Sequence, residues 1–158
     1  MLYLYIFSSY LLFCKLLPYF VYPNYFKKSK IENYLELIQL SSELKGKNKI
    51  ETIENIYEYF KNTYSGKNKV LKLKNLLTVL YIGDFKTNNI LSKKVFLWCH
   101  TQNRLFKSIL VNTKMFKESE IITQKRYFIS IFIHQWLYIK LEDKEVKIDP
   151  YFGIFEKK

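Results

Sequence analysis

The stretch YFISIFIHQWLYIKLEDKEVKIDP, residues 127–150, decides the fold of this chain. Its first part, Tyr127–Leu141, is dominated by Phe, Ile, Tyr and Trp and holds few helix formers, which predicts a β-strand. Glu142, Asp143 and Lys144 form a polar turn signal, and Val146–Ile148 predicts the returning strand. Pro150 ends that strand, because proline lacks the N–H that a ladder needs. We therefore expect an antiparallel hairpin.

The length of the turn decides whether two polar side chains of the hairpin, His134 and Asp149, can meet. If the loop consists of Glu142 and Asp143 alone, Asp149 lies opposite Trp136, two positions from His134 and on the same sheet face. A loop of three residues would place His134 and Asp149 on opposite faces, because the side-chain period of a strand is two. Diagonal neighbours on one face have Cα atoms about 7–8 Å apart, a gap that these two side chains can bridge.

Upstream of the hairpin, a helix begins near Cys99. The apolar residues that follow it repeat with helical spacing and fall on one face: Leu105, Phe106, Ile109 and Leu110. In the first turn, unpaired backbone N–H groups and the positive end of the helix dipole favour a thiolate. Taken alone, an unpaired cysteine is more often a core residue than a nucleophile. Between this helix and the hairpin, Ile121 and Ile122 form a short strand-like run, and Gln124-Lys125 predicts a turn.

Three residues on these elements, Cys99, His134 and Asp149, fit the roles of nucleophile, base and orienting carboxylate. A thiol nucleophile needs a base within hydrogen-bond reach, and the base needs a third group that holds its ring. His100 is a poorer base, because adjacent helix residues point about 100° apart, and we expect it to be exposed or at the rim of the site. A zinc site of Cys99, His100 and His134 would lack a fourth ligand, so we expect neither a metal nor another cofactor.

Trp98, Gln102 and Trp136 are the candidate residues of a substrate cleft. Trp98 would line the acyl site, although packing beneath the start of the helix is the plainer interpretation. Trp136 shares the expected face of His134, where it would shield an ion pair from water and so strengthen it. A core aromatic residue would have the same sequence signature.

The N-terminal half predicts helices. Two amphipathic patterns follow one another, the first made of Ile31, Tyr34, Leu35, Ile38 and Leu44 and the second of Ile50, Ile53, Ile56, Tyr57 and Phe60. Gly46 lies where a left-handed C-terminal cap of the first helix would be needed, and Gly66 can end the second. The leucine-rich segment Leu71–Tyr81 predicts a third helix, which Gly83 and Asp84 end. The expected fold is therefore α+β, with helices packed on a C-terminal antiparallel sheet.

Length and charge limit the number of domains and the kinds of partner. With 158 residues, of which 49% are hydrophobic, the chain can bury one core, which predicts a domain over residues 27–158 and an apolar segment over residues 1–26. The net charge of +12 is typical of proteins that bind nucleic acid or anionic membranes. Arg104 and Arg126 are the only arginines, so the bidentate groups that read phosphate or guanine are scarce and solvated lysine faces are favoured over nucleic acid. A lysine-rich nucleic-acid or membrane-surface protein stays an alternative.

The apolar N-terminal segment has two interpretations. Its part before Lys15 is shorter than the roughly 20 apolar residues that span a bilayer, and no basic residue precedes it as in a secretory signal. It predicts either a packed hydrophobic helix or membrane association through residues 1–22, with three basic residues on the cytoplasmic side: Lys27, Lys28 and Lys30. The two cysteines lie far apart, which suits a reducing compartment. We therefore expect a cytoplasmic protein, or a membrane-associated one whose catalytic part faces the cytoplasm.

The ordered set of a helix that opens with cysteine, a strand with His-x-Trp and a strand that ends in Asp-Pro resembles the transglutaminase-like superfamily of papain-type cysteine enzymes. The resemblance covers roughly residues 51–153, and residues 53–60 are similar to the family's upstream helix. It implies that Cys99 is the nucleophile, His134 the general base and then acid, and Asp149 the group that orients the imidazole. It also implies that the backbone N–H of Cys99 donates to the oxyanion.

The sequence departs from the family pattern in three places. Leu97 stands where glycine is usual, residues 100–102 replace an acidic and then a small residue, and residues 112–114 replace a Gly-Ile turn. The resemblance implies acyl transfer from a peptide or protein amide through a thioester, with hydrolysis if water is the acceptor and cross-linking if an amine is. The departures favour, as an alternative, a binding or scaffold module of the same fold without turnover.

Overall fold

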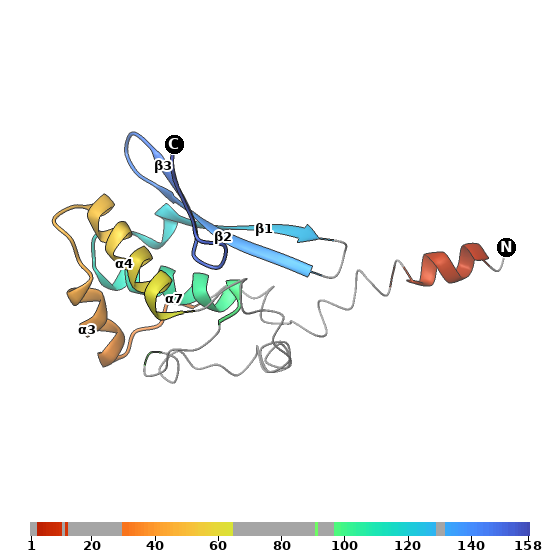
Figure 1. The fold of residues 1–158 in the computed structure, drawn as a ribbon, viewed down its shortest axis with the longest axis horizontal. Helices are drawn as coiled ribbons and strands as arrows, with labels where there is room; N and C mark the ends of the chain where they lie inside the picture. The colour runs from red at the N-terminus through yellow and green to blue at the C-terminus, as the bar shows by residue number, and fades with distance from the viewer. Residues whose placement is uncertain (1–2, 11, 13–29, 65–90, 92–96, 129–131) are drawn as a thin grey trace.

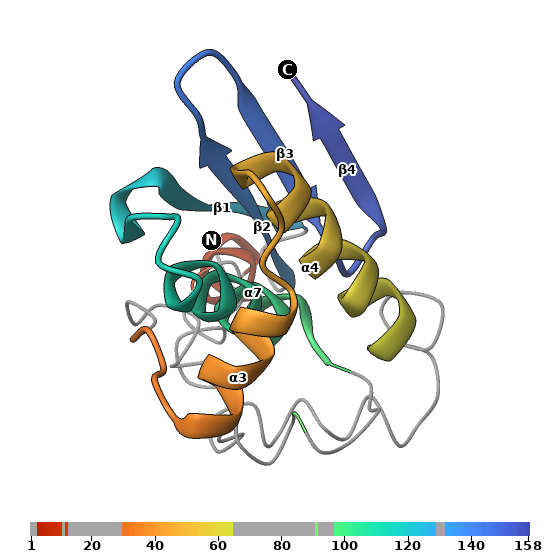
Figure 2. The same cartoon turned by 90° about the vertical axis from the view of Figure 1, so that its left-hand side faces the viewer.

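A computed structural model describes residues 3–10, 12, 30–64, 91, 97–128 and 132–158 of the chain. In this part the fold is α+β: α4 and α7 cover one face of an antiparallel sheet, and α3 packs against α7 (Figures 1 and 2). The elements are α3 (Leu35–Glu43), α4 (Lys49–Thr63), α7 (Cys99–Asn112), the short 3-10 helix η3 (Glu118–Glu120), β1 (Ile121–Phe128), β2 (Phe132–Lys140), β3 (Glu145–Asp149) and β4 (Ile154–Lys157). The sheet order is β1-β2-β3-β4, so sequential strands are neighbours. The α+β expectation is confirmed.

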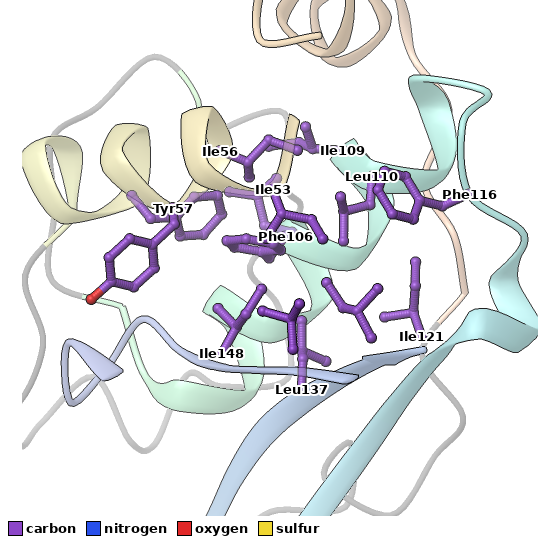
Figure 3. Packing of buried hydrophobic residues seen from close by; sticks show 14 of the residues in the cluster. Ile53, Ile56, Tyr57, Phe106, Ile109, Leu110, Phe116, Ile121, Leu137 and Ile148 are labelled. Carbon is purple, nitrogen blue, oxygen red and sulfur yellow. The ribbon is translucent and has the colours of Figure 1, made fainter. Parts of the chain in front are cut away.

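The side chains of β2 point alternately to the side of the sheet that faces the helices and to the opposite, outer side. The odd-numbered residues from 133 to 139 are buried, whereas His134 and Trp136 lie on the other side and are partly exposed. Figure 3 shows buried residues of the strands, among them Leu137 and Ile148, packed against residues of α4 and α7. The rings of Phe60 and Phe106 join these two helices, with centroids 5.0 Å apart. Each fully buried Leu, Ile or Phe contributes about 1.5–3 kcal/mol. This core therefore fixes which face of the sheet carries His134.

The two helices α4 and α7 agree with the sequence pattern. The side chain of Asn48 caps α4 by accepting a hydrogen bond from the Glu51 N–H at 2.9 Å. Cys99 is the first residue of α7, as expected, and Trp98 is its N-cap. Of the apolar residues expected on the buried faces, Ile50 is partly buried and the others are buried: Ile53, Ile56, Tyr57, Phe60, Leu105, Phe106, Ile109 and Leu110.

The apolar face predicted for α3 is buried only in part: Tyr34 and Leu44 pack against the core, but two other residues of that face do not. Leu35 is 77% exposed and Ile38 is also exposed, whereas Leu37 is fully buried. The chain that leads into α3 is tied to α7, because the Glu32 N–H donates to the hydroxyl of Ser108 at 3.2 Å. This contact joins the chain before α3 to α7, the helix on which α3 packs.

Gly46 is required for close packing, not for a left-handed cap. Its φ is not positive, so the expected cap conformation is absent there. A Cβ atom at Gly46 would lie 2.7 Å from Cγ of Glu51 and 2.9 Å from the backbone N of Thr52. The Gly46 N–H also donates to the hydroxyl of Thr52 at 2.9 Å. The glycine thus lets the chain pass against the first turn of α4.

β1 extends through the position where a turn was predicted. It pairs with β2 from Ile121↔Ile139 to Phe128↔Phe132, so the turn expected at Gln124-Lys125 was wrong and β2 starts later than Tyr127. Gln124 and Lys125 are exposed on a strand at the edge of the sheet. Exposed polar residues on an edge strand have the same local composition as a turn, which explains the error.

The β2–β3 hairpin has the expected register. Leu137 pairs with Ile148, and the Leu141 N–H donates to the carbonyl of Lys144 at 2.9 Å, which closes the two-residue loop. β4 was not predicted. Gly153, with φ of 70°, reverses the chain between β3 and β4.

The N-terminal residues 3–10 and 12 are helical and exposed (Figure 1). The large apolar side chains among them are 58–86% exposed, so they do not pack in the described core. Among the described residues, none of the helices combines the length and apolarity needed to cross a membrane. The described residues do not include the predicted helix end at Gly66, the helix predicted over 71–81 or the end of that helix expected at Gly83 and Asp84.

Candidate active site

The candidate site lies where the β2–β3 ladder ends. The last pair of that ladder is Leu137↔Ile148, and β2 continues beyond it. The first turn of α7 lies beside this continuation, with Sγ of Cys99 3.8 Å from the carbonyl oxygen of Ile133. The tip of the helix therefore reaches β2 directly, past the end of β3.

His134 and Asp149 form a hydrogen bond on the outer side of the sheet. Nε2 of His134 is 2.5 Å from Oδ2 of Asp149. The side chain of His134 is 14% exposed and that of Asp149 is buried. The other carboxylate oxygen, Oδ1, accepts a hydrogen bond from the backbone N–H of Phe152 at 3.2 Å. Both oxygens of Asp149 are therefore held, one by the imidazole and one by the turn that follows β3.

Cys99 completes a cluster with these two residues, which we call the Cys99–His134–Asp149 cluster. Cys99 lies close enough to the His134 ring for a side-chain hydrogen bond and its charge to raise the pKa of His134. Because Nε2 is bonded to Asp149, Nδ1 is the ring nitrogen left for the sulfur. Cys99 is 4% exposed and lies at the N-terminus of a 14-residue helix, where the dipole stabilises negative charge. The structure brings together the three residues that the sequence suggested.

The surroundings of His134 favour its protonated form. Burial of the ring acts to lower its pKa, but the hydrogen bonds to Asp149 and then Cys99, together with the charges of both, outweigh burial and raise the pKa to about 9. A protonated His134 between an ionised carboxylate and a sulfur is the arrangement that stabilises a thiolate. Such a cluster can attack an electrophilic carbonyl and return the proton to a leaving group.

Aromatic side chains surround the imidazole. The Trp136 ring stacks on it with centroids 5.9 Å apart, the Phe152 ring meets it edge-on at 4.5 Å, and Tyr151 lies 6.0 Å away. These rings reduce contact between the His134–Asp149 pair and water, and a lower local dielectric strengthens the interaction of the two charges. The expectation that Trp136 lies against His134 agrees with this geometry.

Two other sequence candidates have different surroundings from those expected. His100 is buried, not exposed, and its ring lies 3.2 Å from the hydroxyl of Thr101. Gln102 is buried, and its amide donates to the carbonyl of Leu97 at 2.9 Å. α7 is covered on several sides, which explains why residues of its first turn are buried. Gln102 therefore stabilises the chain segment that leads into α7.

Sequence reasoning missed Tyr151 and Phe152. Their signal was their position directly after Asp149-Pro150, because a tight turn there must fold back beside the carboxylate. It also missed Asn103, which lies one helical turn after Cys99. Asn103 is 2% exposed, and within the described part of the chain neither the nitrogen nor the oxygen of its amide has a hydrogen-bond partner.

Within the described part of the chain, no group of three or more His, Cys, Asp or Glu side chains could hold a metal ion. The chemistry of the cluster is that of a thiol, an imidazole and a carboxylate. Comparison of the chain with protein-family models, curated proteins and solved structures gives no significant match.

Proposed function

We propose that this chain is a cysteine-dependent acyl-transfer enzyme of the transglutaminase-like kind. The observation that carries the proposal is the series of Cys99, His134 and Asp149 side chains at the tip of α7. Each residue alone has a structural explanation, but a partly buried imidazole with a thiol on one side and a carboxylate on the other has the geometry of nucleophilic catalysis. The order of the three residues along the chain agrees with the family resemblance.

The proposed reaction begins when the Cys99 thiolate attacks the carbonyl carbon of a peptide or protein amide. The backbone N–H of Cys99 belongs to the first turn of α7, where helix N–H groups point toward the N-terminal end, and would donate to the oxyanion. The C–N bond breaks, His134 gives its proton to the leaving amine, and a thioester forms on Cys99. Water then attacks the thioester, loses a proton to His134 and releases a carboxylic acid. An amine acceptor would follow the same steps and release a new amide.

Two of the three departures from the family pattern lie beside the cluster, the third, residues 112–114, lies at the far end of α7, and all leave the three residues of the cluster in place. Leu97 is buried and belongs to the hydrophobic core. His100 and Gln102 are buried in the first turn of α7. These positions thus contribute to packing beneath the helix tip, and the reactive atoms are supplied by residues that do not depart from the pattern.

Alkylation of Cys99 tests the proposal. All variants would carry Cys14→Ser, so that one thiol is present, and the rate with iodoacetamide would be compared with that of N-acetylcysteine at pH 7. We expect Cys99 to react at least about tenfold faster than N-acetylcysteine, and His134→Ala to remove the difference, because the imidazolium that stabilises the thiolate is lost. Lys125→Ala, an exposed change on β1, is the matched control. A rate equal to that of free cysteine in the parent chain would instead support a binding module without turnover.

The exposed N-terminal helix favours a second property, association with an anionic membrane surface. The apolar residues between 3 and 12 are exposed on all sides of the helix, and the chain carries a net charge of +12. We expect the full chain to sediment with vesicles of phosphatidylcholine and phosphatidylglycerol at four to one. Ile6→Glu would weaken this binding, whereas Leu35→Glu, at an exposed leucine on α3, would not. Equal binding of the two variants would refute this property.

A further inference from the structure

Three aromatic residues form one surface beside Cys99 and His134, which we call the aromatic wall: Trp98, Tyr151 and Phe152. The rings of Trp98 and Tyr151 are nearly parallel, with 14° between their planes and centroids 6.4 Å apart. Phe152 meets Tyr151 at 77° with centroids 5.3 Å apart. The wall thus joins the residue before α7 to the turn between β3 and β4.

The aromatic wall reaches both reacting groups. Tyr151, on which Trp98 stacks, lies close enough to Cys99 for the charge of the sulfur to raise its pKa, and the edge of Phe152 lies against the ring of His134 at 4.5 Å. A group attached to a carbonyl carbon at Sγ of Cys99 would therefore lie within reach of these rings.

Phe152 is the solvent-facing part of the wall. It is 38% exposed, and the other large exposed apolar residues of the described chain lie on the N-terminal helical residues or on α3. Its position is defined, because its N–H is bonded to Asp149 and Gly153 has a φ of 70°. A fixed, exposed aromatic ring beside a reactive group is typical of a ligand-binding surface.

The aromatic wall carries no charge. Burial, and then the charges of Cys99 and Asp149, raise the pKa of Tyr151 above its ordinary value of 10, so its phenol stays protonated. The side chains of Trp98 and Phe152 do not ionise. The rings exclude water from a group placed against them, which costs free energy for a charged group and favours an apolar one.

We propose that the aromatic wall is a specificity subsite that binds an apolar side chain, aromatic or branched aliphatic, of the acyl donor. The subsite rests on the proposed function, because the donor is the molecule that reacts at Cys99. An apolar side chain gains free energy in proportion to the area it removes from water. We therefore expect a preference of about fivefold or more for donors with a large apolar group over donors with a small one.

Two maleimides of different size test the subsite. In the Cys14→Ser chain, the rate of Cys99 with N-benzylmaleimide is divided by its rate with N-ethylmaleimide, and the same ratio for N-acetylcysteine corrects for intrinsic reactivity. We expect a corrected ratio of about five or more in the parent chain and below about two in Phe152→Ala. Phe152→Leu, which keeps an apolar side chain, should retain most of the preference. Leu35→Ala removes an exposed apolar residue elsewhere and should leave the ratio unchanged.

The outcomes separate the subsite from the proposed function. A corrected ratio near one in the parent chain, or an unchanged ratio in Phe152→Ala, overturns the subsite even if Cys99 is strongly reactive. Failure of the proposed function has another signature: the iodoacetamide rate of Cys99 would equal that of N-acetylcysteine and would not respond to His134→Ala. Circular dichroism melting of each variant shows that a loss of preference is not a loss of folding.

Discussion

Replacement of Asp149 by asparagine should return His134 to an ordinary titration. Asparagine has nearly the same shape and can still accept a hydrogen bond from Nε2, but it removes the negative charge 2.5 Å from the ring. In the native chain the pKa of His134 is raised from 6.5 to about 9, and after burial, which lowers it, the hydrogen bond to Asp149 is the largest influence. We expect the pKa in Asp149→Asn to fall well below 9, and the pKa in Cys99→Ser to fall by less.

The raised pKa of His134 also predicts how the free energy of unfolding depends on pH. At about 1.4 kcal/mol for each pH unit, the difference between 6.5 and about 9 corresponds to about 3 kcal/mol of stabilisation of the imidazolium in the folded chain. Because the folded pKa lies above the unfolded one, this contribution is fully present below pH 6.5 and is lost as the pH rises toward 9. The free energy of unfolding should therefore decrease by up to about 3 kcal/mol across this window, and by much less in Asp149→Asn.

Histidine NMR titration measures the first of these effects directly. The chain has two histidines, so loss of one resonance in His134→Ala assigns both. Urea unfolding at intervals between pH 6 and 9.5 measures the second effect, with His100→Gln as the matched control for a histidine outside the cluster. A native His134 that titrates at or below 6.5, or one that Asp149→Asn leaves unmoved, would refute the reasoning.

Three further predictions concern stability and are measured by urea unfolding. Asn103→Leu should stabilise the chain by about 1–3 kcal/mol, because it replaces a buried amide that lacks hydrogen-bond partners among the described residues, and a loss of stability would show that the amide is satisfied. Gly46→Ala should destabilise by more than the roughly 1 kcal/mol typical of point substitutions, because the new Cβ would lie 2.9 Å from the backbone N of Thr52. Phe106→Ala should cost about 3–5 kcal/mol, because the ring is fully buried against Phe60, and a cost below 1 kcal/mol would contradict the described core.

The sequence predicted best where one residue pattern determined one structure. The apolar spacing of α4 and α7 placed their buried faces, and the two-residue loop at Glu142 and Asp143 fixed the register that brings Asp149 near His134. Strand register is a discrete choice, because a shift of one residue reverses every side chain. A correct loop length was therefore enough to place two residues of the cluster on the same face.

The sequence failed where tertiary contacts decide between local alternatives. The buried face of α3 depends on its packing against α7, a helix far from it in the chain. The burial of His100 depends on how completely other segments cover α7. The angle of about 100° between adjacent helix residues does not show which parts of the helix other segments cover. Gln124 and Lys125 have a composition that suits both a turn and an exposed edge strand, so pairing with β2 alone distinguishes them.

Sequence reasoning did not predict β4 or the turn before it, and this turn orients the carboxylate of Asp149. Asp149 ends β3, and a terminal strand residue without further contacts would have freedom about its side-chain torsions. The turn removes that freedom, because the Phe152 N–H holds one carboxylate oxygen while the other faces His134. Gly153 allows this turn, and β4 anchors it to the core, with the rings of Phe155 and Tyr57 5.1 Å apart. The orientation of the imidazole therefore depends on a hairpin that contributes no reactive atom beyond Asp149 itself, and changes in β4 should alter the His134 pKa before they alter the position of Cys99.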